Sequence, residues 1–528
     1  MGSLPRATSA RVLLRRRLPA GLDLAEVFDD VFPSPGRRVW LDSSARGSGS
    51  GRYSFAAEAS AQAGALLTYR VGDAGMRVER FDGSACSTVI GDVLEVLAAQ
   101  LVDLDVTDRA EVPFIGGLVG WFGYEFKGDL GFPGPHRALT PDAAWLLVDR
   151  VVAIDHDTGE AQGFALVAND VSNRAAGHEW LAQTAQRCTR AGSGSTSPIE
   201  QAPRVEASPV GTADVSIPMV PPVSLPANPG PGCLPTTNAE ALWRRGRERY
   251  LADVQAAKAV LESGQSYEVC LTDTATAPFA GTALELYLAL RQANPAPYSA
   301  FLDIGGVQVV SASPERFLHV DAAGRVETRP IKGTAARHRD PARDLTAAAS
   351  LQADAKTVAE NIVVVDLLRN DLHQVCVPGS VATPRLLEVE TYPSVHQLVS
   401  TVEGQLRDGL GPLDAVRACF PGGSMTGAPK RRTCEIIDEI EGAPRGIYAG
   451  TLGYLSASGI ADLAIVIRTA VVRDGWVSVG AGGGIVLDSE PHEEYEEMRL
   501  KAEATLRVIR SVNALGDAGE VAALAAES

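Results

Sequence analysis

Short runs of apolar residues, alternating with polar positions or punctuated by glycine, fill the first 190 residues. This period of two is typical of β-strands rather than helices. Strands are predicted within Arg38–Phe55, Gly116–Phe126 and Ala144–Val167. The last run predicts a hairpin that turns near Asp157–Gly159.

The C-terminal part of the chain mixes helical and strand patterns. The stretch from Asn238 to Gly264 predicts a helix, because a candidate capping asparagine and a closing glycine bracket it. Apolar runs predict strands within Gly306–Val320, Leu463–Arg473 and Trp476–Leu487. Strands and helices do not alternate in a regular βαβ rhythm, so we expect an α+β fold with mainly antiparallel sheets.

A proline-rich segment divides these two parts. Ten of the 32 prolines fall between Pro198 and Pro235, and aromatic residues are absent from 191–242. Such a composition buries too little apolar surface to offset the cost of ordering. We therefore predict an N-terminal region at 1–190, a linker or surface excursion at 191–237, a catalytic region at 238–512 and a C-terminal tail at 513–528.

Composition and charge narrow the functional classes. The chain of 528 residues has 45% hydrophobic residues and a net charge of −17, which disfavours nucleic acid as a partner. The sequence has no run of about 18 apolar residues, so no membrane span is expected. Seven cysteines are spread singly without metal-binding spacing, which favours a reducing compartment, and we predict a cytoplasmic location.

Two glycine-rich stretches resemble nucleotide loops but fail on inspection. In PGGSMTGAPK, Gly422 and Gly427 have the Walker spacing, but Ala428 replaces the lysine that binds phosphate. In GAGGGIV, Ile485 replaces the last glycine of a dinucleotide fingerprint. Both stretches can still bind a carboxylate through backbone amides, and structural turns are the alternative.

Acidic residues recur on two predicted helices. Glu494, Glu497 and Lys501 have the spacing of one helix face, and Glu360 adjoins the apolar run of a second helix. If the two faces meet over a cavity, their oxygens suit a hard cation such as Mg²⁺. An acidic face that is simply solvated is the alternative.

Two positive charges fall in runs that predict buried strands, Lys332 in TRPIKGTAAR and Arg468 in AIVIRTAVV. A buried charge needs an anionic partner, which is either an internal carboxylate or a substrate. Burial also disfavours the charged form of lysine, and a neutral amine is a nucleophile or base. A structural salt bridge is the alternative reading of Lys332.

Together these segments resemble the chorismate-utilising enzymes, the family of anthranilate synthase, aminodeoxychorismate synthase, isochorismate synthase and salicylate synthase. The resemblance covers about residues 240–510, and LDSS, RYSF and GGLVGWFGYE look like the family's upstream half. It implies an anthranilate synthase component I-like fold, with antiparallel sheets packed face to face and helices around them. The segments that carry it, in the family's order, are SASPERFL, TRPIKGT, AENIVVVDLLRNDL, PSVHQLVSTVEG, FPGGSMTGAPKRR, EIIDEIEGAPRGIYAGTLGYLS, IRTAVV and GAGGGIVLDSEPHEEYEE.

Lys332 is the residue from which we predict the ring position at which chorismate is aminated. Members that aminate chorismate at C2, the anthranilate synthases, have alanine in PIAGT, whereas members that aminate at C4, the aminodeoxychorismate synthases, have lysine as here. YEVCLT, Tyr267–Thr272, is also closer to the aminodeoxychorismate branch than the common YQVNL form. The resemblance therefore implies conversion of chorismate and ammonia to 4-amino-4-deoxychorismate, a step toward para-aminobenzoate and folate.

The resemblance also implies roles for individual residues. Neutral Lys332 would attack C2 of chorismate while Glu315 protonates the departing C4 hydroxyl as general acid. Mg²⁺ held by Glu360, Glu494 and Glu497 would neutralise the ring carboxylate. The substrate itself would be bound by Gly333, Thr334, Thr426, Gly427, Tyr448, Arg468, Gly482, Gly483 and Lys501.

Two departures from the family pattern limit this transfer. Thr357 stands where many relatives have an acidic residue, so a carboxylate beside the metal ligands is missing. Many relatives have histidine where Gln397 stands, and His396 lies one position earlier, so we assign His396 a packing or supporting role. Whether Thr357 weakens metal binding is left open by the sequence.

Partners and rival functions complete the expectations. No glutaminase segment with a cysteine nucleophile is visible, since Cys233 lies in the proline-rich linker, so a separate glutamine amidotransferase subunit is expected to supply ammonia. The N-terminal region could hold tryptophan, as in aminating relatives. The rivals are C2 amination to anthranilate or 2-amino-2-deoxyisochorismate, and a non-catalytic subunit that senses chorismate or tryptophan.

Overall fold

The computed structural model describes residues 11–44, 51–102, 104, 112–194, 242–392 and 395–526. Two large antiparallel sheets form the body of these residues. The first has eleven strands in the order β1 (Arg11–Leu18), β10 (Ala161–Ala168), β9 (Arg150–Asp155), β3 (Tyr53–Glu58), β2 (Arg37–Asp42), β12 (Tyr298–Ile304), β13 (Val307–Ser313), β22 (Thr469–Arg473), β23 (Trp476–Ile485), β11 (Glu268–Pro278) and β19 (Gly427–Ala428).

The second sheet has twelve strands among the described residues. Eleven follow one another, and β17 (Ala382–Thr391) pairs with β18 beside them. Their order is β16 (Ile331–Ala336), β18 (Val395–Gln405), β15 (Arg325–Arg329), β14 (Arg316–Val320), β21 (Ala461–Ile465), β20 (Thr451–Ser456), β7 (Gly117–Phe122), β8 (Ala143–Val148), β4 (Ala65–Tyr69), β5 (Met76–Arg80) and β6 (Ser87–Val89).

Apolar side chains from both sheets share one core. Phe55 and Leu302 of the first sheet belong to the same buried cluster as Trp121 and Leu146 of the second. The two sheets therefore pack face to face, as predicted, because each buries the apolar face of its alternating strands against the other. Strands from before and after the predicted linker lie next to each other in both sheets, so the two halves of the chain share one body.

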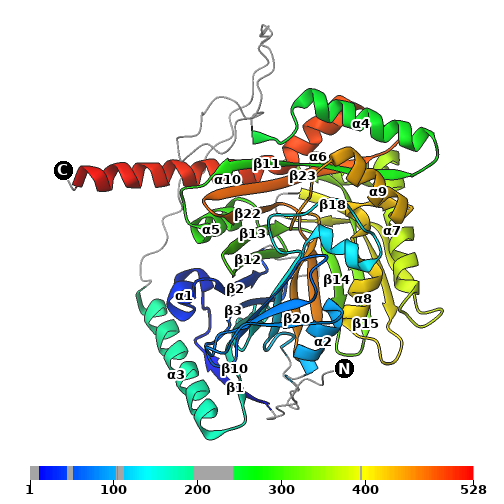
Figure 1. Cartoon of the computed structure of the whole chain (residues 1–528). Coiled ribbons are helices and arrows are strands. Elements are labelled where there is room, and N and C mark those ends of the chain that lie inside the picture. The colour runs from blue at the N-terminus through cyan, green and yellow to red at the C-terminus, as the bar shows by residue number, and fades with distance from the viewer. Residues whose placement is uncertain are drawn as a thin grey trace.

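Helices surround the sheets. Figure 1 shows α4, α9 and α10 gathered near strands β11 and β23, with α3 at the other end of the molecule. The helices are α1 (Leu24–Val31), α2 (Val93–Val102), α3 (Val171–Gly194), α4 (Arg247–Glu262), α5 (Ala283–Ala293), α6 (Pro341–Ala353), α7 (Ala355–His373), α8 (Pro412–Cys419), α9 (Lys430–Glu441) and α10 (Pro491–Ala526), with short 3₁₀ helices at η1 (Tyr124–Leu130) and η3 (Gly423–Met425).

Most predicted elements are confirmed, including the hairpin of β9 and β10 and the helices α7 and α10. The start of α4 was predicted wrongly. The helix begins at Arg247 rather than after Asn238, which itself lies outside the described residues. Buried Trp243 forms a β-bridge with Ala275, and the amide of Arg244 donates to the Thr274 carbonyl, so these residues pair with β11 instead of joining the helix. Gly246, in a β conformation, then caps the helix.

The predicted linker at 191–237 lies outside the described residues, except that residues 191–194 end helix α3. The predicted tail at 513–528 is largely helical, since α10 continues to Ala526. Cys233 is not described, and the six described cysteines are free. In the described ranges, no helix combines the length and apolar character that a bilayer crossing requires.

Candidate active site

A lysine–glutamate pair connects the two sheets. Lys332 on β16 of the second sheet donates a hydrogen bond to Oε1 of Glu268, the first residue of β11 in the first sheet. Both side chains are buried. Gly484 on β23 makes room for the pair, because a side chain there would overlap Oε1 of Glu268. The sequence prediction did not identify Glu268.

In the structure Lys332 forms a salt bridge, which was the alternative reading of this residue. Burial works against the ammonium, but the nearby carboxylates of Glu268 and Glu360 outweigh it and raise the pKa of Lys332. The amine is therefore protonated at neutral pH. A nucleophilic role requires that this proton leaves first.

Glu315 lies between β13 and β14, fully inside the protein. Its backbone is fixed, since its carbonyl accepts a hydrogen bond of 3.0 Å from the amide of Ile465. Burial raises the pKa of Glu315 to about 7, while a hydrogen bond with Ser424 and the charge of Lys332 limit the shift. A carboxyl that still carries its proton near neutral pH has the protonation state of a general acid.

Glu360 of α7 and Glu494 and Glu497 of α10 approach the site from two helices, as predicted. The Nζ of Lys356 lies 2.8 Å from Oε1 of Glu494 and 4.0 Å from Oε1 of Glu360. Lys501 lies 2.7 Å from Oε1 of Glu497. Lysine side chains therefore balance the charges of these carboxylates.

Among the described residues, no group of three or more His, Cys, Asp or Glu side chains is arranged to hold a metal ion. The expected ligands Glu360, Glu494 and Glu497 are thus near one another but not assembled into a metal centre. Burial raises the pKa of Glu360 to about 7. Glu494 also accepts a hydrogen bond of 2.6 Å from the Ser489 hydroxyl. Carboxylate oxygens suit a hard cation, but a cation at Glu494 would have to displace the Lys356 ammonium.

The glycines of β23 lie in a strand, as the apolar run at Trp476–Leu487 predicted, and not in the structural turn that was the alternative. Gly482 and Gly483 pair with Thr272 and Leu271 of β11, and a side chain at Gly482 would overlap the Leu271 carbonyl. In the described part, β22 pairs with β23 only as far as Val479. Along a strand the backbone amides of successive residues point to opposite sides. Every second amide of the segment 480–484 therefore points away from β11, and a carboxylate can bind to these amides.

Thr426 and Gly427 lie beside β11. The amide of Cys270 donates to the Thr426 carbonyl over 2.8 Å, and Gly427 pairs with Val269. The Thr426 hydroxyl is fully buried and donates to the Gly422 carbonyl over 3.1 Å. Gly427 has φ of +139°, and a side chain there would overlap the Glu268 carbonyl, so only glycine fits.

The predicted position of Arg468 inside a strand was wrong. Arg468 lies between β21 and β22 with φ of +53° and is only partly buried. Among the described residues its guanidinium has no hydrogen bond or ion pair. Burial lowers the pKa of Arg468, while Tyr448 and Glu497 partly offset the shift. Because no side chain in the described part pairs with the guanidinium, this cation is available to an anionic ligand.

Gly333 and Thr334 form an irregular part of β16 rather than a turn, since the pairing with β18 shifts register between Ile331 and Thr334. Gly333 has φ of +85°, and a side chain there would overlap Thr357. Thr357 thus packs against the backbone that carries Lys332.

His396 has the supporting role that we expected. The residue is buried, with Nε2 3.0 Å from Asp344 Oδ1 and Nδ1 2.9 Å from Thr391 Oγ1. These contacts tie β18 to α6 and β17, away from Lys332.

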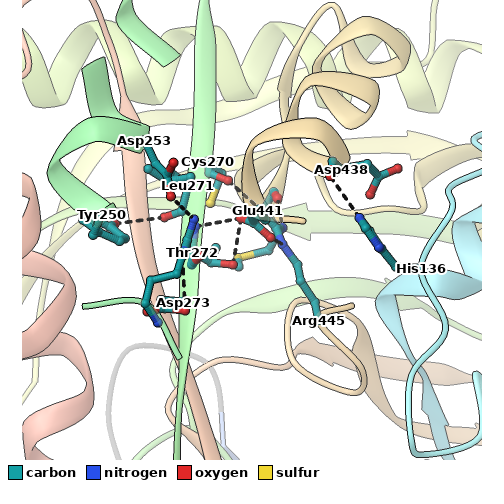
Figure 2. Close-up of polar contacts among 12 residues, drawn as sticks. His136, Tyr250, Asp253, Cys270, Leu271, Thr272, Asp273, Asp438, Glu441 and Arg445 are labelled. Carbon is teal, nitrogen blue, oxygen red and sulfur yellow. Dashed lines mark hydrogen bonds and ion pairs between the residues drawn. The ribbon is translucent and has the colours of Figure 1, made fainter. Parts of the chain in front are cut away.

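A buried Arg445–Glu441 pair holds the segments that carry the site (Figure 2). Arg445 donates to the carbonyls of Cys270 and Met425, each over 2.7 Å. Glu441 accepts from the amide of Thr272 over 2.8 Å. The pair therefore fixes β11 against the chain that leads to Thr426.

Replacing Arg445 with methionine should lower the free energy of unfolding by about 3–5 kcal/mol, because Glu441 would remain buried without its counter-charge. Urea unfolding measures this change. Arg432→Met on α9, the helix that ends at Glu441, is the control, since the Arg432 side chain is 39% exposed and its loss should cost under about 1 kcal/mol. Equal losses in the two variants would contradict the role of the buried pair.

A separate cavity of about 270 Å³ lies between the sheets and is lined by residues from both halves of the chain. LDSS and RYSF, the segments that look like the family's upstream half, contribute Asp42, Ser43 and Tyr53 to its lining. Tyr298 and Arg316 approach from the C-terminal half. The expected tryptophan would have to bind in this cavity or elsewhere in the N-terminal region, and its binding stays a prediction.

A family model described as chorismate binding enzyme matches residues 76–507. The chain belongs to this family. The match includes strands of both sheets and every residue of the candidate active site. The resemblance inferred from the sequence motifs is thereby confirmed.

Relatives of this chorismate binding enzyme include aminodeoxychorismate synthase from Streptomyces pristinaespiralis, which is 41% identical over 93% of the chain and 64% of the relative. Aminodeoxychorismate synthase component 1 from Escherichia coli is 37% identical over 80% of the chain and 83% of the relative. Anthranilate synthase component 1 from Streptomyces coelicolor is 36% identical over 80% and 78%. The chain thus spans under two thirds of the Streptomyces pristinaespiralis relative but most of the component 1 proteins.

The solved structure of anthranilate synthase component I from Streptococcus pneumoniae superposes with a TM-score of 0.65, at 26% identity, over 87% of this chain and 93% of that one. Menaquinone-specific isochorismate synthase from Escherichia coli gives 0.62 at 17% identity, over 95% and 94%. The predicted anthranilate synthase component I-like fold is confirmed.

Proposed function

We propose that the chain is an aminodeoxychorismate synthase component I that converts chorismate and ammonia to 4-amino-4-deoxychorismate. The observation that supports the proposal is the buried amine of Lys332, whose charge acts on the equally buried carboxyl of Glu315. The similarity to aminodeoxychorismate synthases from Streptomyces and Escherichia coli supports the same assignment.

The proposed chemistry uses the two groups in sequence. The Lys332 amine attacks C2, the ring double bond moves, and the C4–oxygen bond breaks as Glu315 passes its proton to the departing hydroxyl. Ammonia then adds at C4, the double bond moves back, and Lys332 leaves C2. Glu315 takes up the proton that the new amine loses, so both residues return to their starting state.

The surrounding residues hold the dianionic substrate in this proposal. Arg468, whose guanidinium has no ion pair or hydrogen bond among the described residues, binds the enolpyruvyl carboxylate beside Tyr448. Within the segment of Gly482 and Gly483, the amide that points away from β11 donates to the same carboxylate. Gly333, Thr334, Thr426 and Gly427 shape the ring site, and Lys501 adds positive charge. Loss of one orienting contact of this kind costs on the order of tenfold to a hundredfold in rate.

Magnesium is part of the proposal. Glu360, Glu494 and Glu497 would hold Mg²⁺, which when bound would neutralise the ring carboxylate of chorismate. For the ion to bind, Lys356 would swing away from Glu494, which is feasible because the lysine side chain is long and 38% exposed. Residue 357 is threonine rather than an acidic residue, so Glu360, Glu494 and Glu497 are the candidate ligands on the two helices.

Replacing Lys356 with methionine should strengthen Mg²⁺ binding by about tenfold, because the variant lacks a cation that competes for Glu494 at close range. Calorimetric titration of Mg²⁺ measures the change directly. Arg499→Met removes a charge from α10 that pairs with Glu496 instead, so it should leave the affinity unchanged. Weaker binding in the Lys356 variant would mean that the lysine supports the metal site rather than competing for it.

Partners are proposed on the same grounds. The Escherichia coli relative is named component 1, which implies that it works with a second component. We propose that the second component here is a glutamine amidotransferase that delivers ammonia. Tryptophan is proposed as a ligand of the cavity between the sheets. A cytoplasmic location is proposed because the described cysteines are free. Folate biosynthesis is proposed because 4-amino-4-deoxychorismate is a step toward para-aminobenzoate. If glutamine alone supports turnover by the purified chain, the partner proposal is wrong.

Product identification tests the proposed function. The chain is incubated with chorismate, Mg²⁺ and ammonium, and the product is resolved by liquid chromatography and mass spectrometry. We expect aminodeoxychorismate. Fluorescent anthranilate would favour the second candidate, C2 amination, which the Streptomyces coelicolor relative supports. Binding without any turnover would favour a regulatory subunit.

A further inference from the structure

The Lys332–Glu268 pair poses a problem that the proposed function does not solve. A lysine that attacks carbon must first lose its proton, yet Lys332 lies against a carboxylate and is charged at rest. Glu315 cannot accept this proton, because its own proton is needed for the departing hydroxyl in the same step. A second carboxylate in contact with the amine could accept this proton directly.

Glu268 is placed to accept this proton. It is the carboxylate that touches Nζ of Lys332, and its side chain is almost completely buried. Gly484 leaves the space that the pair fills, and its Cα faces both Oε1 of Glu268 and Nζ of Lys332. Since β11 and β16 belong to different sheets, this contact also fixes the distance of the amine from the ring site.

The second oxygen of the carboxylate supports proton uptake. Oε2 of Glu268 is buried without a hydrogen-bond partner among the described residues. A buried acceptor without a donor makes the anionic carboxylate costly. Passing one proton from Lys332 to Glu268 turns two buried charges into two neutral groups, so burial favours the transfer once substrate has excluded water.

We propose that Glu268 is a positioning residue that holds the amine of Lys332 in the site and takes up its proton when the amine attacks chorismate. The inference rests on the proposed function. In the first half-reaction the proton moves from Nζ to a Glu268 oxygen, and the freed electron pair forms the bond to C2. In the second half-reaction the C2–nitrogen bond breaks, and Nζ recovers the same proton from Glu268.

The first test needs no turnover. Lys332 is labelled with acetic anhydride at a series of pH values in the full chain, and the peptide is quantified by mass spectrometry. Glu268→Gln should shift the labelling profile of Lys332 to lower pH, because the variant lacks the carboxylate that holds the proton. Identical profiles, or an amine in the variant that never reacts, would overturn the proposal. Other charged or ionisable groups near Lys332 are Cys270, Glu315, Glu360 and Glu497.

The second test uses the pH dependence of kcat with ammonium. In Glu268→Gln the proton must leave to solvent, so kcat should fall about a hundredfold below that of the unmodified chain at pH 7. Because Glu315 titrates in both proteins, the ratio of the two kcat values is compared, and this ratio should recover about tenfold per pH unit as the pH rises. Glu268→Asp should restore part of the activity at pH 7. A loss that is equal at all pH values would show a merely structural role and overturn the proposal.

The two tests fail separately. If no aminodeoxychorismate forms even in the unmodified chain, the proposed function is wrong while the labelling still reports on the pair. If Glu268→Gln does not fold by circular dichroism, Glu268→Asp replaces it in the labelling. Its shorter side chain lengthens the contact, so the same shift to lower pH is expected, and an unchanged profile contradicts the proposal.

Discussion

Lys332→Ala is expected to abolish C4 amination, lowering kcat by about a thousandfold or more, because the variant lacks the nucleophile that forms the first bond to the ring. Part of the remaining turnover should divert to C2 chemistry. Chromatography with fluorescence detection measures both products, since anthranilate fluoresces and aminodeoxychorismate is not aromatic.

Lys332→Arg is the matched control for this experiment. Arginine keeps the positive charge beside Glu268, but its guanidinium stays protonated and is not a nucleophile. If Lys332 acts as a nucleophile, both variants lose C4 amination. If the arginine variant keeps most of the activity, the lysine contributes only its charge, and covalent participation is ruled out.

The second large effect is expected at Glu315. Burial raises its pKa to about 7, so the carboxyl holds a proton below that pH and loses it above. Since the departing hydroxyl needs the proton, kcat of the unmodified chain should fall as the pH rises through about 7. Glu315→Gln should lower kcat by about a hundredfold to ten-thousandfold, the usual contribution of a general acid.

The pH profile of the Glu315 variant distinguishes two carboxyls. Burial also raises the pKa of Glu360 to about 7, so titration of this residue could produce a similar fall of kcat, the limb of the pH profile near pH 7. If Glu315 is the acid, the limb near pH 7 disappears in Glu315→Gln. If the limb persists at its original pH, the titrating group is another residue and the assignment of the acid is wrong.

The fold was largely predictable because its patterns are local. Alternating runs located the strands, and the i, i+3 and i+7 spacing placed Glu494, Glu497 and Lys501 on one face of α10. The start of α4 was missed because a tertiary contact, the bridge of Trp243 to β11, overrides helical pattern. Propensity alone carries no information about such contacts.

The site was predicted less completely, and the reason is electrostatic. A lone lysine in an apolar run indicates a buried charge, but the sequence does not say which carboxylate faces it across 64 residues. Glu268 had one signal, an acidic residue at the start of the apolar strand in YEVCLT. Arg468 was placed in a strand because apolar residues flank it, while its positive φ depends on how β21 leads into β22.

The balance of charge around the carboxylates was also invisible in the sequence. Lys356 lies one helical turn before Glu360, which marks a possible ion pair, but its closer contact is with Glu494 on another helix. Spacing identifies neighbours within a helix and not between helices. A metal site inferred from spacing alone therefore misses a lysine that competes for it.

Trapping the covalent intermediate tests the central claim most directly. The chain is mixed with chorismate and Mg²⁺ without ammonium, quenched rapidly, digested and analysed by mass spectrometry. Attack by Lys332 predicts that the peptide carrying this residue gains the mass of chorismate less one water, and that the added mass disappears when ammonium is supplied before the quench. An unmodified peptide under conditions in which the chain turns over would contradict the account.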